Sequence, residues 1–160
     1  MRYLTLSELI YINGRLLNNA QIMSGKQKVR DVELLDAAVA RPAASAFGQD
    51  AYPTLHEKAA ALFHSVARNH PFADGNKRTA TLAAILMLAV NGERVIWQPQ
   101  EALERIAAVA EGRAEMETLA EWFPTEACEP APDADAERDR QKIDALIAAH
   151  RWLLDELAKR

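Results

Sequence analysis

The segment at residues 70–78 contains the side chains whose types and spacing could carry out a reaction. It reads His-Pro-Phe-Ala-Asp-Gly-Asn-Lys-Arg and lies between two stretches with helical spacing of apolar residues. The imidazole of His70 can accept a proton from a hydroxyl group near neutral pH. Asp74 offers the hard oxygen ligands that suit a magnesium ion shared with phosphates.

The second half of this segment begins a helix and is rich in groups that attract anions. The N-terminus of a helix presents unpaired backbone N–H groups and a partial positive charge, which together favour bound anions. Gly75 would let a ligand approach the backbone closely. Lys77 and Arg78 add full positive charges, and an arginine can hold a phosphate through two parallel hydrogen bonds. The segment therefore suits phosphoryl or nucleotidyl transfer, in which positioning and charge neutralisation dominate catalysis.

Each of these residues also has a structural interpretation. A histidine beside a proline often makes a structural hydrogen bond in a loop, and Asp-Gly-Asn is a common turn sequence. Lys77 and Arg78 could be the solvated edge of a helix. The residues alone leave both interpretations open.

Composition describes a soluble, mainly helical protein. The 160 residues are 49% hydrophobic and 26% charged, and only 6% are aromatic, which favours helices over strands. The net charge of −4 disfavours direct binding to nucleic acid. The single cysteine, Cys128, allows no internal disulfide, and neither a signal peptide nor a membrane span is expected. A cytoplasmic protein is predicted.

Capping signals predict where the first helices begin. Thr5 and Glu8 have the spacing of a capping box, as do Thr54 and Glu57, and Asp31 can cap a further helix. Residues 18–25 suit a turn, and residues 43–53 suit a loop or a short hairpin. A helix is expected from Asn76 to the Asn-Gly pair at 91–92. Its residues 80–90 are apolar nearly all round, which indicates a buried central helix.

The remaining elements are a short strand at 95–97 and helices at about 99–110 and 113–123. Residues 125–136 are rich in proline and aspartate and read as a linker. Beyond them, one amphipathic helix set apart from the rest is expected. Its apolar stripe consists of Ile143, Leu146, Ile147, Leu153, Leu154 and Leu157. The predicted organisation is a catalytic domain at 1–124, a linker at 125–136 and a C-terminal helix at 137–160.

The segment H-P-F-A-D-G-N-K-R-T-A resembles the signature of the Fic/Doc family. With lysine at position 77, the segment resembles the signature of the death-on-curing branch of that family. The flanking run Ala-Tyr-Pro-Thr-Leu-His-Glu-Lys-Ala-Ala at 51–60 agrees with this resemblance, which extends from about residue 3 to residue 123. The resemblance implies an all-α fold around the buried helix, in which residues 43–53 are a flap hairpin that pairs with the target segment.

The resemblance also implies roles for the site residues. His70 would be the general base and Asp74 the magnesium ligand. The phosphates of ATP would be held by Gly75, Asn76, Lys77 and Arg78. Phe72 would anchor the loop in the core.

Two transfers occur in this family. Most members pass AMP from ATP to a protein hydroxyl, whereas the death-on-curing type passes on the γ-phosphate, with elongation factor Tu as its target. Lys77 fills space that a glycine would leave for phosphates, which favours phosphate transfer, with AMP transfer as the alternative. A toxin that inhibits growth and is paired with an antitoxin is therefore expected.

Two other classes of function remain as alternatives. One is a catalytically weak Fic/Doc scaffold used for partner binding, and the other is a helical nucleic-acid-binding regulator. For the C-terminal helix, a lone amphipathic helix needs a surface to cover its apolar face. Self-association into a homo-oligomer is the simplest prediction for it.

Overall fold

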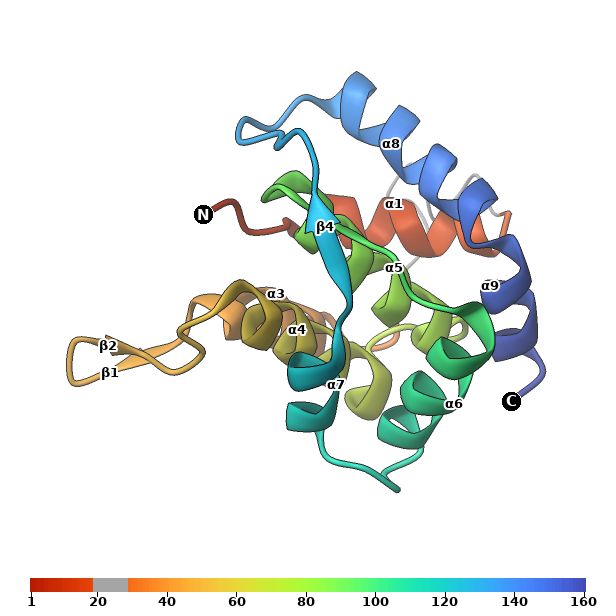
Figure 1. The fold of residues 1–160 in the computed structure, drawn as a ribbon, viewed down its shortest axis with the longest axis horizontal. Coiled ribbons are helices and arrows are strands. Elements are labelled where there is room, and N and C mark those ends of the chain that lie inside the picture. Colours follow the sequence, from red (N-terminus) through yellow and green to blue (C-terminus); the bar gives the residue numbers. More distant parts are fainter. Residues whose placement is uncertain (19–28) are drawn as a thin grey trace.

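The computed structural model describes residues 1–18 and 29–160, which form a mainly helical protein (Figure 1). The turn predicted at residues 18–25 lies mostly outside these described residues. The α-helices are α1 (Leu6–Leu16), α3 (Val32–Ala40), α4 (Leu55–Asn69), α5 (Asn76–Val90), α6 (Pro99–Ala110), α7 (Met116–Trp122), α8 (Ala136–Ala149) and α9 (Arg151–Ala158). A short 3-10 helix, η1 (Arg41–Ala43), follows α3. The predicted all-α class is confirmed.

Four short strands form two small antiparallel sheets. Strands β1 (Ser45–Ala46) and β2 (Gln49–Asp50) pair with each other, and β3 (Glu93–Val95) pairs with β4 (Thr125–Ala127). Strand β3 begins two residues before the predicted 95–97, and β4 lies inside the segment predicted to be a linker. Its pairing with β3 brings the chain back to the end of α5.

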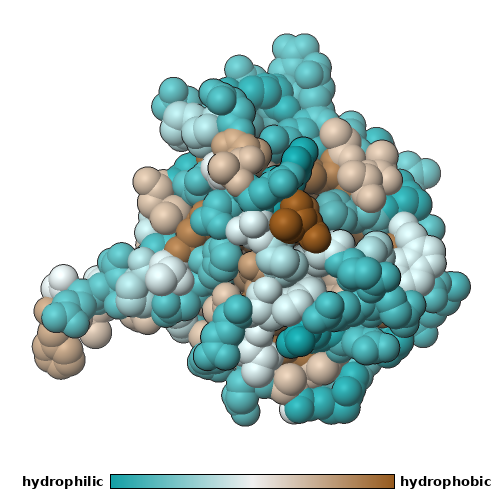
Figure 2. Space-filling model, in the orientation of Figure 1, coloured by the Kyte–Doolittle hydropathy of each residue, from teal (hydrophilic) through white to brown (hydrophobic). Residues whose placement is uncertain are grey.

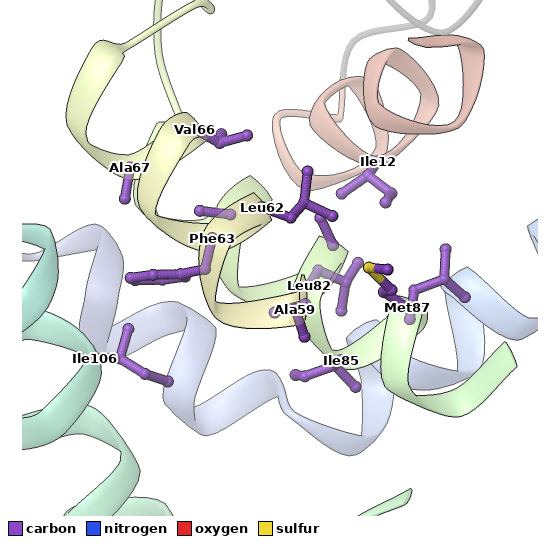
Figure 3. Close-up of a cluster of buried hydrophobic side chains, with 14 of the residues drawn as sticks. Ile12, Ala59, Leu62, Phe63, Val66, Ala67, Leu82, Ile85, Met87 and Ile106 are labelled. Atoms are coloured by element: carbon purple, nitrogen blue, oxygen red, sulfur yellow. The ribbon is translucent and has the colours of Figure 1, made fainter. Parts of the chain in front are cut away.

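Helix α5 is the centre of the fold, as its apolar sequence predicted. Every residue from Thr79 to Val90 is buried, and α5 packs against α1, α4, α6, α8 and α9. In the core, Leu62 and Phe63 of α4 lie beside Leu82 and Ile85 of α5, and Ile12 reaches the same cluster from α1 (Figure 3). The most extensive packing between two helices is that of α4 on α5, which are joined by the segment that begins at residue 70.

The predicted caps are present. Thr5 and Glu8 form a complete capping box at the start of α1. The side chains of Asp31 and Thr54 accept hydrogen bonds from backbone N–H groups in the first turns of α3 and α4. Each satisfies a backbone donor that the helix itself cannot pair.

The predicted hairpin is formed by β1 and β2, and it projects from the body of the molecule (Figure 1). Phe47 and Gly48 turn the chain with positive φ angles, and the Phe47 side chain is fully exposed at the apolar tip (Figure 2). The hairpin joins the N-terminal end of α4, whereas His70 lies at the other end of this 15-residue helix, about 22 Å away. Its predicted role as a flap over the site remains a prediction.

The C-terminal segment differs from the single separate helix that was expected. It forms two helices, α8 and α9, which meet at His150 and pack on the main body through α1, α5 and α6. Its apolar stripe, including Ile143, Leu153 and Leu157, joins the common core. The stripe is thus covered by the chain itself, which removes the physical reason for expecting self-association. The division at residues 124 and 136 remains a prediction about sequence organisation.

A buried ion pair joins the first residues to α8. The Arg2 guanidinium donates to the Asp139 carboxylate at 2.6 Å and to Glu8 at 2.8 Å, and it also reaches the Ala131 carbonyl oxygen. The side chains of Arg2 and Asp139 are almost completely buried. Among the described residues, no helix combines the length and apolar character needed to cross a membrane.

Candidate active site

The segment at 70–78 forms the loop between α4 and α5 and the first turn of α5, and it borders a pocket of about 260 Å³. His70 ends α4 in the left-handed conformation (φ 52°, ψ 59°), and Gly75 adopts the same region just before α5. The lining residues comprise seven from this segment and three from the end of the chain: His70, Ala73, Asp74, Gly75, Asn76, Lys77, Arg78, Leu157, Ala158 and Arg160. The structure thus brings all six sequence-predicted site residues to one pocket.

Phe72 and Asn76 hold the loop in shape. Phe72 is buried in the core, as expected. The Asn76 side chain accepts a hydrogen bond from the Phe72 N–H and donates one to the Phe72 carbonyl oxygen, both at 3.0 Å. Because the amide is used inside the loop, the group that Asn76 can offer to a ligand is its backbone N–H.

Helix α1 supports the loop at Gly75. A Cβ atom at Gly75 would lie 3.2 Å from Leu17 Cδ2 and 3.3 Å from Asn13 Nδ2. The buried Asn13 amide donates to the Asp74 carbonyl oxygen at 2.9 Å and to the Thr79 hydroxyl at 3.1 Å. Gly75 is therefore required both by its positive φ and by this close approach.

Arg30 and Asp31 form a second support, which the sequence did not predict. The Arg30 guanidinium donates to the carbonyl oxygens of Asn69 and His70, and the Asp31 N–H donates to the Pro71 carbonyl oxygen at 3.0 Å. The carbonyls of Asn69 and His70 are at the end of α4, where the helix leaves them unpaired, and Pro71 lies just beyond. The only local signal was the Arg-Asp pair before a helix start, and it does not reveal a partner 40 residues away.

The pocket is built to attract an anion. Among the described residues, no side chain caps the N-terminus of α5, so its first backbone N–H groups remain free for a ligand. Lys77 and Arg78 line the same opening. Together they place a helix N-terminus and two cations at one point, an arrangement suited to phosphate groups.

Glu111, at the end of α6, borders this cationic region. Its carboxylate lies 4.0 Å from Lys77 Nζ and 2.7 Å from an Arg113 nitrogen. The hydrogen bond from Arg113 and the charges of Arg113, Lys77 and Arg160 outweigh desolvation and lower the pKa of Glu111. The ionised form of Glu111 is therefore favoured, and its negative charge lies beside the Lys77 ammonium group.

His70 and Asp74 supply the groups for proton transfer and cation binding. Both side chains are exposed at the pocket. One Asp74 carboxylate oxygen accepts from the Gly75 N–H at 2.7 Å, and the carboxylate keeps further lone pairs for a ligand. The described residues contain no cluster of three or more His, Cys, Asp or Glu side chains able to hold a metal. A single exposed carboxylate fits a magnesium ion that also binds substrate phosphates and water.

Two other histidines, both on α4, have structural partners. His56 lies 2.7 Å from a Glu93 carboxylate oxygen, and His64 Nδ1 lies 2.9 Å from an Arg41 nitrogen. Neither lines the pocket. Both histidines therefore make structural contacts away from the candidate site.

The fold and the site define the class of protein, and comparison with known proteins agrees. The model of the Fic/DOC family matches residues 3–88, more than half of the chain, and the chain belongs to this family. Members of this family are transferases that use a nucleotide.

A similar protein is the toxin Doc of Mycolicibacterium smegmatis (strain ATCC 700084 / mc(2)155), which is 63% identical over 68 residues. This match covers 42% of the chain and 52% of that toxin, so the chain spans about half the length of the curated relative it matches. No solved structure matches the chain.

Proposed function

We propose that this protein is a toxin-type transferase that moves the γ-phosphate of ATP to a hydroxyl group of a target protein. The observation that carries the proposal is the pocket at the start of α5, where an imidazole, a carboxylate, two cations and free backbone N–H groups meet. Phosphoryl transfer requires this combination of a proton acceptor and concentrated positive charge.

Each residue has a specific part in the proposed reaction. The backbone N–H groups at the start of α5, including that of Asn76, bind the phosphates together with Lys77 and Arg78. Gly75 lets the ligand approach the backbone closely, while its own N–H donates to Asp74. The target hydroxyl oxygen bonds to the γ-phosphorus while its proton passes to the His70 imidazole. The bond from this phosphorus to the bridging oxygen breaks, and ADP leaves with the electron pair.

Asp74 is the residue that would bind Mg²⁺. The ion would supply additional positive charge at the phosphate oxygens. The role of Asp74 is to fix that charge next to the N-terminus of α5, where the other anion-binding groups already lie.

Lys77 supports phosphate transfer over AMP transfer. Its side chain lines the pocket, and its ammonium group lies 4.0 Å from Glu111. There it would occupy space that a glycine would leave for deeply placed phosphates. This favours a nucleotide pose with the γ-phosphate toward the target. AMP transfer is the alternative, and it places the α-phosphate at the same point.

The similarity to a protein named as a toxin supports growth inhibition as the outcome and an antitoxin as a partner. A translation factor such as elongation factor Tu is the proposed target class. The contacts of α8 and α9 with the main body mean that the proposal needs no second copy of the chain.

The test uses bacterial lysate and ATP labelled separately at the α and γ positions. We expect label from the γ position on a protein band, and none after His70→Ala. His56→Ala, a change on the same helix outside the pocket, is the matched control and should transfer normally. Lys77→Gly should lose γ transfer and gain AMP transfer. Label from the α position with the unaltered chain would contradict phosphate transfer, and full activity of His70→Ala would remove the general base.

A further inference from the structure

One wall of the pocket comes from a part of the chain beyond the residues that the family model matches. Besides the segment at 70–78, the pocket is lined by Leu157, Ala158 and Arg160 from the end of α9 and the residues after it. We propose that Arg160 binds the phosphate groups of the nucleotide, as a third cation beside Lys77 and Arg78. This inference rests on the proposed function and extends the same site.

Helix α9 holds this wall in a fixed place. Leu153, Leu154 and Leu157 are at most 2% exposed and belong to the common core. The helix packs against α6 and α5, and α5 is the helix whose N-terminus faces the pocket. Leu157 is buried in the core and also lines the pocket. Because Arg160 comes only three residues after Leu157, its backbone is attached to a well-packed helix.

The local charges explain why a cation is needed at this position. The C-terminal end of a helix carries partial negative charge from its unpaired carbonyl groups, and the end of α9 faces the pocket. The ionised Glu111 adds a full negative charge near Lys77. Both would repel a phosphate. A guanidinium at residue 160 offsets them and restores a cationic wall opposite the N-terminus of α5.

The dimensions of the pocket indicate which part of the ligand it takes. Its volume of about 260 Å³ lies below the roughly 300–1,000 Å³ typical of sites that enclose a whole organic ligand. The lining is mostly charged and polar, and the described residues place no aromatic side chain along it except the His70 ring. The chemical class that fits is a polyphosphate, with the nucleoside outside the enclosed part.

The neighbouring cations Lys159 and Arg160 allow a test variant and a control variant to be compared. Lys159 carries the same charge one residue away, but its ammonium group bonds to Glu156 at 2.6 Å and does not line the pocket. Titration calorimetry with Mg-ATP and with inorganic tripolyphosphate would be compared for the unaltered chain, Arg160→Ala, Arg160→Lys and Lys159→Ala. Loss of one charge-assisted contact should weaken binding of both ligands on the order of tenfold in Arg160→Ala.

The other two variants should bind both ligands more tightly than Arg160→Ala does. Lys159→Ala removes an exposed charge that does not line the pocket, and it should change binding by less than about twofold. Arg160→Lys should recover part of the affinity, because it keeps the charge and loses the paired donors. Equal effects of Arg160→Ala and Lys159→Ala, with normal binding to the unaltered chain, would overturn the inference while leaving the proposed function intact. Failure of the unaltered chain to bind either ligand would overturn both.

Discussion

The guanidinium of Arg30 holds the backbone of His70: its Nε atom lies 2.5 Å from the His70 carbonyl oxygen. His70 ends α4 with a positive φ angle, a conformation that costs energy for residues other than glycine. The same guanidinium also donates a hydrogen bond to the Asn69 carbonyl oxygen at 2.9 Å, so Arg30 holds the end of α4 at two points. Arg30 is thus a positioning residue for the proposed base.

The first prediction follows from these two hydrogen bonds of Arg30. Arg30→Ala should lower kcat for transfer by roughly 10- to 100-fold, because a small displacement of a reacting group carries a large rate cost. KM for ATP should change little, since Arg30 does not line the pocket. Arg151→Ala, which removes another exposed arginine with only a 3.9 Å contact to Asp155, is the control. Steady-state kinetics would measure both constants, and an unchanged kcat in Arg30→Ala would contradict the positioning role.

The second prediction separates backbone conformation from packing at Gly75. Both Gly75 and Gly48 have φ near +75°, but a Cβ at Gly48 would have no neighbour within 4 Å. In Gly48→Ala the free energy of unfolding should therefore fall by only about 1–2 kcal/mol, the cost of a positive φ angle for alanine. Gly75→Ala should lose a further 1–3 kcal/mol or so, because the new methyl group presses on Leu17 and Asn13. Urea unfolding would measure both, and equal losses would show that the contact with α1 relaxes freely.

The third prediction concerns the ion pair between Arg2 and Asp139. Asp139→Asn should lower the free energy of unfolding by about 3 kcal/mol, because it leaves a buried guanidinium without its main partner. Asp144→Asn breaks a similar pair with Arg15, but those two side chains are 42% and 37% exposed. That variant should lose less than about 1 kcal/mol. Similar losses in the two variants would contradict the importance of burial.

The same pair predicts acid sensitivity. Burial by itself raises the pKa of Asp139, but the hydrogen bonds from Arg2 and from the Asp135 backbone, with the nearby positive charges, outweigh it and lower the pKa. A carboxylate with a lowered pKa stabilises the fold fully above its ordinary value of 3.8, and the contribution is lost as pH falls through the folded-state value. Unfolding free energies between pH 6 and pH 3 should therefore fall less steeply in Asp139→Asn.

The fourth prediction concerns His150, at the junction of α8 and α9. Burial lowers its pKa below the ordinary value of 6.5, and its ring packs edge-on against Trp97 at 5.7 Å. Neutral His150 is thus favoured in the folded state, so stability is full above pH 6.5 and declines as pH falls below it. His64 has a pKa lowered in the same direction, by burial and then by the charges of Arg41 and Arg68. His150→Gln should therefore remove part of the decline between pH 7.5 and pH 5.5, measured by urea unfolding, and an unchanged decline would assign it to other groups.

The sequence predicted the elements whose signals are local. Thr5, Asp31 and Thr54 are recognisable caps because the bonds they make lie within one helical turn. The central helix α5 was predicted for a similar reason, since an apolar surface on all sides has only one stable environment. The spacing within residues 70–78 placed the site residues on one loop, and the pocket that they line lies there.

What the sequence did not predict depends on contacts between distant residues. Asn13 reaches Asp74 across 61 positions and Arg30 reaches His70 across 40, and neither spacing leaves a pattern in one sequence. The break at His150 was also missed, because neither proline nor glycine marks it and the apolar stripe continues on both sides. The stripe indicated that α8 and α9 need a surface, but it could not identify that surface as α1, α5 and α6.

The wall supplied by α9 affects when the pocket comes into existence during protein synthesis. A ribosome adds residues in order, at about 5–20 per second, and early segments can begin to fold before later ones are made. The loop at 70–78 is therefore complete while the chain still lacks Leu157 and Arg160, which enclose its other side. A nascent chain that has been made only through α7 carries the whole signature loop but an open cleft. Enclosure of a ligand begins only after translation has passed residue 157.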